Sequence, residues 1–125
     1  MTATNRVIVA GSRSLEDYDL VCKTLDPIFA GLDKDDTVIL SGTARGADRL
    51  GEQWAAEHGY TVIRYPANWD KYGKQAGYVR NNEMAENATH LVAFWDGMSK
   101  GTRHMIAAAS GRGIQTWVIR FEVQP

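Results

Sequence analysis

The stretch TVILSGTARGAD, residues 37–48, is decisive for the fold of this chain. Four apolar or β-branched residues, typical of a buried strand, are followed by a serine, two glycines and an arginine, and then by a helical apolar pattern. A strand that leads through a glycine-bearing bend into a helix is the repeating unit of α/β proteins. An α/β fold requires that the rest of the chain repeat this unit.

The same alternation of strand and helix patterns runs from end to end. Short runs rich in β-branched or aromatic residues predict strands covered on both faces, at 6–10, 37–40, 60–65, 90–95 and 116–120. Apolar residues at helical spacing predict helices over 18–29, 47–55, 76–88 and 102–109. Right-handed crossovers place such helices on both faces of a parallel sheet. The pattern predicts an α/β fold: one Rossmann-like domain over residues 1–125, with an open, parallel, five-stranded sheet.

Helix boundaries are also marked in the sequence. Ser14 with Asp17 resembles a capping box, and Ser99 is expected to cap the last helix at its N-terminus. Glycines stand where helices are expected to stop, at Gly31, Gly59, Gly111 and Gly113.

Composition and charge narrow the function. The chain has 125 residues, 44% of them hydrophobic, and Cys22 is its single cysteine, so no disulfide can form within it. No leader pattern or apolar run of membrane length occurs, and we expect a cytoplasmic protein. A net charge of -1 argues against a duplex-DNA binder. The second half, residues 64–125, has eight basic and five acidic side chains, which leaves room for a small anion.

The loops that follow the first four predicted strands differ from those at the other edge. They read GSRS, SGTARGAD, PANWDKYGKQAG and DGMSKGT. Ligands of open parallel sheets bind beyond the carboxyl ends of the strands, and glycine bends at helix starts present amide groups to phosphates. We expect the following residues to bind phosphate, ribose or a nearby part of the ligand: Gly11, Ser12, Arg13, Ser41, Gly42, Gly46, Arg80, Asn81, Ser99, Lys100, Gly101 and Thr102.

Several residues near this edge allow two interpretations. Asp48 could accept a hydrogen bond from a ribose hydroxyl or a neighbouring loop, or it could only complement the helix dipole. Trp69 could stack on a base or anchor its loop. The three histidines have no metal-ligand spacing, so neither a metal nor a cofactor is expected, and only His104 is kept as a site candidate. The Walker and dinucleotide-binding glycine motifs are both absent.

Four segments together resemble the SLOG superfamily of Rossmann-like nucleotide-binding proteins, in its small YspA/YpsA-related branch. They are VIVAGSR (7–13), SGTARGAD (41–48), AGYVRNNEM (76–84) and HLVAFWDGMSKGTRHMI (90–106). The resemblance implies a pocket for a nucleotide or a nucleotide-derived molecule such as an ADP-ribose compound, often in a homodimer. It also implies a link to nucleotide metabolism or to nucleotide sensing in bacterial and phage conflict systems.

The LOG phosphoribohydrolases, more distant relatives in this resemblance, define the alternative function. Arg80 and Met84 match their Arg-Lys-x-x-Met segment, and Gly101 and Thr102 match their glycine-rich loop, but Met105 stands at the place of the catalytic glutamate. A thioether cannot transfer a proton.

We therefore expect a binding protein for a nucleotide-type ligand, acting as sensor, sequestering agent or processing protein. The alternative is an N-glycosidase that cleaves a nucleoside monophosphate or NAD-like compound, with Asp48, Asp96 or Glu83 as its carboxylate. A single-strand nucleic-acid binder is a third hypothesis, against which the acidic first half argues.

Overall fold

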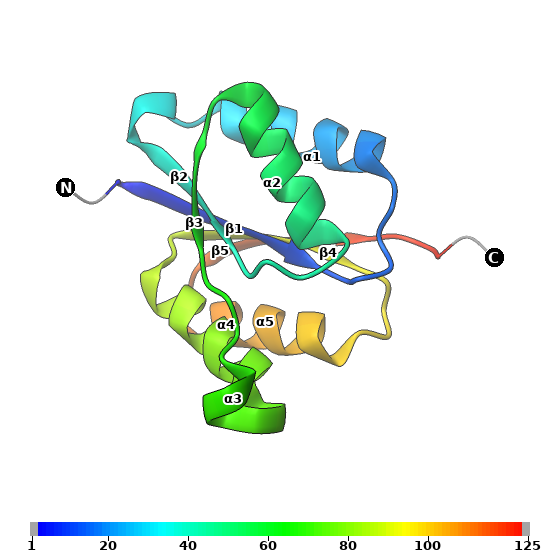
Figure 1. The fold of residues 1–125 in the computed structure, drawn as a ribbon. Helices are drawn as coiled ribbons and strands as arrows, with labels where there is room; N and C mark the ends of the chain where they lie inside the picture. The colour runs from blue at the N-terminus through cyan, green and yellow to red at the C-terminus, as the bar shows by residue number, and fades with distance from the viewer. Residues whose placement is uncertain (1–2, 124–125) are drawn as a thin grey trace.

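The computed structural model describes residues 3–123, which contain one five-stranded sheet. Its strands are β1 (Asn5–Gly11), β2 (Thr37–Ser41), β3 (Thr61–Arg64), β4 (His90–Trp95) and β5 (Gln115–Arg120). They lie in the order β3-β2-β1-β4-β5, and every neighbouring pair is parallel (Figure 1). The predicted α/β fold with an open parallel sheet is confirmed.

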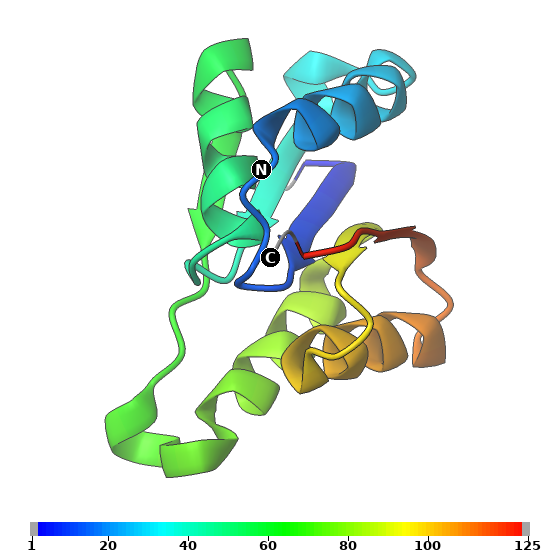
Figure 2. The same ribbon diagram turned by 90° about the vertical axis from the view of Figure 1, so that its right-hand side faces the viewer.

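Helices cover both faces of this sheet, as predicted. The helices α1 (Tyr18–Ala30) and α2 (Ala47–His58) lie on one face, and α4 (Ala76–Asn87) and α5 (Lys100–Gly111) lie on the other (Figure 1). Three short elements were not predicted. A 3-10 turn, Lys34–Asp36, precedes β2, and the long loop after β3 contains a single helical turn, α3 (Trp69–Tyr72), which runs into a 3-10 turn over Gly73–Gln75. Figure 2 shows this green segment standing away from the body, beyond α4. None of the helices within residues 3–123 is long and apolar enough to cross a membrane.

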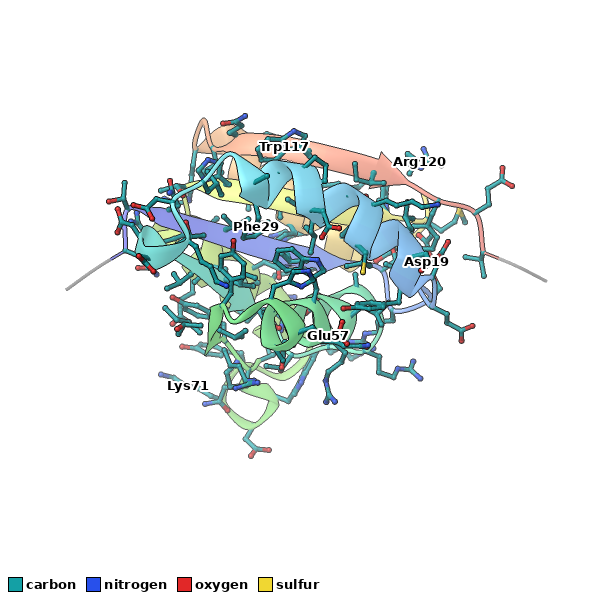
Figure 3. All side chains as sticks on the ribbon, turned by 90° about the horizontal axis from the view of Figure 1, so that it is seen from above. Asp19, Phe29, Glu57, Lys71, Trp117 and Arg120 are labelled. Carbon is teal, nitrogen blue, oxygen red and sulfur yellow. The ribbon has the colours of Figure 1, made fainter. Side chains whose placement is uncertain are left out.

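The core has two halves because successive residues of the central strands point to opposite faces. Val7, Val9 and Ile39 pack with Phe29 and Trp54 beneath α1 and α2. The rings of Phe29 and Trp54 lie 4.8 Å apart between their centroids, and Figure 3 shows Phe29 between α1 and α2. On the other face, buried residues of β1, β2 and β4 pack against α4 and α5; they include Ile8, Leu40, Leu91, Met84 and Met105.

The two edge strands are more exposed than predicted. Ile63 of β3 and Val118 of β5 each keep 41% of their surface accessible. The expectation that every strand is covered on both faces is right for β1, β2 and β4 and wrong for these two, because the helices pack over the centre of the sheet.

Most of the predicted helix caps are confirmed, and one is wrong. Asp17, not Ser14, caps α1 by accepting a hydrogen bond from the Leu20 amide, at 3.1 Å. Ser14 instead donates to Asp96, at 2.9 Å, so the predicted capping box is wrong. Ser99 caps α5 as predicted, and Gly31 and Gly59 follow α1 and α2.

Candidate functional site

A cavity of about 710 Å³ lies at the carboxyl edge of the sheet, where the sequence predicts the ligand site. It is lined by residues of the loops after β1, β2 and β4, by α3 and the turn that follows it, and by the starts of α4 and α5. A cavity of this volume lies within the ordinary range for small-molecule sites.

The structure brings most of the predicted site residues to this cavity. Those that line it are Gly11, Arg13, Asp48, Arg80, Asn81, Asp96, Ser99, Gly101 and Thr102. The others lie behind the lining or away from it; they are Ser12, Ser41, Gly42, Gly46, Lys100 and Glu83. The predicted bends therefore meet in one place, although not every residue within them reaches the cavity.

The loop after β1 and the start of α2 are held together by close backbone packing at Gly46. Its φ is +74°, and a Cβ built there would lie 2.6 Å from the Arg13 carbonyl oxygen. The Ala47 amide donates to the Ser12 carbonyl, at 3.3 Å. Gly46 thus allows the sharp turn that its loop was expected to make.

Two hydroxyl groups that were expected to face a ligand are turned inward. Ser12 is 1% exposed; its oxygen accepts from the Asp96 amide, at 3.1 Å, and lies 3.3 Å from Thr102 Oγ1. Ser41, also 1% exposed, donates to Glu52 at 2.6 Å. A buried hydroxyl needs a partner, and both serines find one within the fold. Ser12 joins the loop after β1 to the loop after β4, Ser41 joins the end of β2 to α2, and neither lines the cavity.

Asp48, which is buried, and Arg80, which is partly exposed, form the polar centre of the wall. Asp48 is 5% exposed, and its Oδ2 accepts from the Ala44 amide of the preceding loop, at 3.1 Å. Burial raises the pKa of Asp48 to about 6, against the opposing effects of the Ala44 amide and the positive charge of Arg80. Asp48 thus accepts from the loop that precedes its own helix, and it also stands in the first turn of α2, where a carboxylate complements the helix dipole.

The guanidinium of Arg80 is fixed by acceptors from three parts of the chain. It donates to the Gly42 carbonyl, to the Tyr65 carbonyl at 3.5 Å and to Asn81 Oδ1 at 3.1 Å. Burial lowers its pKa, while the nearby Asp48 carboxylate opposes that shift. Arg80 therefore joins the loops after β2 and β3 to α4.

Three other cations line the cavity without a counter-ion. In the described part of the chain, Arg13, Arg45 and Lys74 form neither an ion pair nor a side-chain hydrogen bond. Arg45 and Lys74 were not predicted as site residues. Both are cations in the loops expected to face the ligand, and that position could have identified them. Together with Arg80, they give this cavity a surplus of positive charge over Asp48 and Asp96.

The start of α5 is partly occupied by a carboxylate of the protein itself. Asp96 Oδ1 accepts from the Met98 and Ser99 amides, at 2.9 and 2.8 Å. Burial acts to raise the pKa of Asp96, but these two amides and the hydroxyls of Ser14 and Ser12 outweigh it, and the pKa is lowered. Asp96 is therefore an ionised acceptor at neutral pH, and the amide of Ser99, a residue expected to bind the ligand, is already bonded.

Glu83 and His104 lie outside the cavity lining. Glu83 is exposed on α4, whereas the neighbouring Met84 is buried. The His104 ring stacks on Tyr78, with 4.4 Å between centroids, and its Nδ1 lies 3.2 Å from the Asn81 amide nitrogen. Burial lowers the pKa of His104. Across residues 3–123, no cluster of three or more His, Cys, Asp or Glu side chains is placed to hold a metal ion.

Known proteins resemble this chain in sequence and in fold. The Gene 61 protein of Mycobacterium phage D29 is 36% identical over 130 residues, an alignment that covers 96% of this chain and 98% of that protein. The X-ray structure of DNA processing protein A (DprA) from Streptococcus pneumoniae has a TM-score of 0.72 at 18% sequence identity. That match covers 95% of this chain but only 51% of the DprA chain, so this chain spans about half the length of DprA. The sequence model of the YspA, cpYpsA-related SLOG family matches residues 5–72, which include β1, β2, β3 and the wall of the cavity at Arg13, Arg45 and Asp48, and this chain belongs to that family.

Proposed function

We propose that this protein binds a small phosphorylated nucleoside-type ligand in the cavity, as a sensor, sequestering agent or processing protein. Nucleoside phosphates, ADP-ribose and NAD-like compounds are the candidates. The observation that carries the proposal is the set of cations at the cavity, Arg13, Arg45 and Lys74, which have no counter-ion among residues 3–123. Arginine forks match the geometry of phosphate oxygens, and an anionic ligand would neutralise these charges.

Family membership supports the same proposal. The resemblance to the SLOG superfamily implies a nucleotide pocket, and the family model matches the segment that carries Arg13, Arg45 and Asp48. We further propose that residues 1–125 form one ligand-binding domain. The homodimer and the cytoplasmic location stay predictions, which light scattering and cell fractionation would test.

Calorimetric titration with AMP, ADP-ribose, NAD and cyclic ADP-ribose tests the proposal. We expect wild type to bind at least one of these ligands, and the double variant Arg13→Ala/Arg45→Ala to bind it at least about ten-fold more weakly, because each lost charged hydrogen bond costs about 1.5–3 kcal/mol. Arg112→Ala is the matched control, since Arg112 is exposed at the far end of α5 and pairs with Glu86. Folded wild type that binds none of the four compounds would refute the proposal.

A second candidate function, N-glycosidase activity, is favoured by one observation. Asp48 lines the cavity with a pKa raised to about 6 by burial, so a fraction of it keeps a proton near neutral pH and could protonate a leaving base. Asp96 is held ionised, and Glu83 lies outside the cavity, so Asp48 is the carboxylate that fits this role best. Release of free base from AMP or NAD, measured by chromatography, should stop in Asp48→Asn; release that persists in this variant would exclude Asp48 as the acid.

DNA is the third candidate, because the structural neighbour is a DNA processing protein. The net charge of -1 argues against a long phosphate-binding surface. A gel-shift assay with a single-stranded oligonucleotide at low and physiological salt would decide between this candidate and a small-molecule ligand.

A further inference from the structure

We propose that Trp69 and Tyr78 form a nucleobase subsite at the α3–α4 end of the cavity. This inference rests on the proposed function and adds to it the direction in which the ligand lies. The base would stack on Trp69, and the phosphate groups would lie toward Arg13 and Arg45, which come from the loops after β1 and β2.

The first observation is that Trp69 lines the cavity but is not buried by the fold. Its side chain stays 53% exposed, whereas Trp54 in the core is 1% exposed. A tryptophan that anchors its loop should bury its ring, because the indole is the largest apolar surface that a side chain offers. Trp69 therefore presents an open aromatic face, and a flat ligand group would cover it.

The second observation is the space that α4 leaves beside this ring. A Cβ built at Gly77 would lie 3.8 Å from Trp69 Cη2 and 3.8 Å from Arg80 Nη2. Because residue 77 is a glycine, no side chain fills the space between the indole and the Arg80 guanidinium.

The third observation is a second, fixed aromatic ring in the same wall. Tyr78 lines the cavity and stacks on His104, with 27° between the ring planes, and the Asn81 amide nitrogen lies 3.2 Å from His104 Nδ1. The segment that carries Trp69 is a short helical turn with open space beside it. Asn68 caps the one-turn helix α3, and Gly73, with φ +57°, has nothing within 4 Å of a Cβ built there. Tyr78 therefore has a stacking partner within the fold, whereas the Trp69 ring stacks on no aromatic side chain among residues 3–123.

Stacking distinguishes ligands that carry a base from those that do not. Replacing an aromatic residue that stacks on a base by alanine weakens binding by about 1–3 kcal/mol, which corresponds to a loss of about 5- to 150-fold in affinity. A phosphosugar gains nothing from Trp69, so its affinity should not depend on that side chain.

The experiment compares base-bearing with base-free probes by calorimetry. AMP and ADP-ribose are paired with ribose 5-phosphate and inorganic pyrophosphate, on wild type, Trp69→Ala and Tyr72→Ala. Tyr72 is the matched control, since it belongs to the same helix, is 40% exposed and does not line the cavity. We expect Trp69→Ala to weaken the base-bearing probes about ten-fold or more, with the base-free probes and the Tyr72→Ala variant unchanged.

Intrinsic fluorescence gives an independent readout among the four tryptophans of the chain. AMP should quench wild type and Trp117→Phe but not Trp69→Phe. The base subsite is overturned if Trp69→Ala binds AMP as well as wild type does, if it loses both probe classes equally, or if only a single-stranded oligonucleotide shows Trp69-dependent binding. If wild type binds no nucleotide at all, the proposed function itself fails.

Discussion

The Asp48 carboxylate and the Arg80 guanidinium approach each other over Gly42. A Cβ built on Gly42 would lie 2.8 Å from both Asp48 Oδ2 and Arg80 Nη1. Gly42 does not have a positive φ, so its backbone conformation is open to any residue. The loop after β2 therefore requires glycine at this position for space, because no side chain fits there.

Gly42→Ala should therefore separate the two charged groups. We expect a loss of about 1–3 kcal/mol in the free energy of unfolding, since the added methyl overpacks the buried wall, and weaker binding of any cavity ligand. Urea denaturation and calorimetry would measure the two effects. Gly111→Ala is the matched control, because a Cβ there meets nothing within 4 Å. Equal behaviour of the two variants would mean that the wall has more room than the structure shows.

Asp48→Asn should change how stability depends on pH. The folded pKa of about 6 lies above the ordinary value of 3.8, so the folded state holds a proton that the unfolded state releases, and wild-type stability should fall as the pH rises from about 4 to about 6. The full difference is about 3 kcal/mol, from 1.36 kcal/mol per pKa unit. The asparagine side chain cannot ionise, so the stability of the variant relative to wild type should rise over that range. Urea denaturation from pH 4 to pH 7 measures it, and parallel curves for the two proteins would contradict the raised pKa.

Asp96→Ala should show the opposite pH dependence. The lowered pKa means that the ionised carboxylate stabilises the folded state at pH values above the ordinary value of 3.8, and that this stabilisation is lost as the pH falls through the folded pKa. Removing the acceptor of the Met98 and Ser99 amides should cost about 1–2 kcal/mol at pH 7 and less at pH 3. Asp70→Ala, on exposed α3, is the control for a general charge effect. A cost for Asp96→Ala that is the same at both pH values would show that the charge is not what matters.

Local patterns were enough to predict most of the fold. The strand over 90–95 has the predicted bounds, and the helix over 76–88 ends one residue early, because alternating and helical periods are properties of neighbouring residues. Pairings between distant residues were not predictable in this way. Ser14 donates a hydrogen bond to Asp96, 82 positions along the chain, so the capping box predicted from the local pattern is not formed.

The candidate site shows the same division. The edge of the sheet at which the cavity lies follows from the order of strands and helices. That order does not predict which side chain within a loop faces the cavity, because this depends on contacts between loops. Ser12 and Ser41 turn inward to partners from other segments, whereas Arg45 and Lys74 are left facing the cavity.

Gly46→Ala tests how tightly the loop after β1 packs on the start of α2. Two effects act at this position: φ is +74°, which strains any residue with a Cβ, and that Cβ would meet the backbone carbonyls of Ser12 and Arg13. Gly59→Ala is the comparison for an ordinary left-handed residue: its φ is +76° and its ψ 30°, whereas Gly46 has ψ -126°, and the nearest atom to the Gly59 Cβ is the flexible Lys34 Nζ, at 3.3 Å.

Strain alone should cost Gly59→Ala about 1 kcal/mol, whereas strain with a backbone clash should cost Gly46→Ala at least about 3 kcal/mol in urea denaturation. The Gly46 variant should also bind cavity ligands more weakly, since Arg13 moves with the displaced backbone. If both variants lose only the strain cost, the loop after β1 is not held by α2, and the position of Arg13 in the cavity must be fixed by something else.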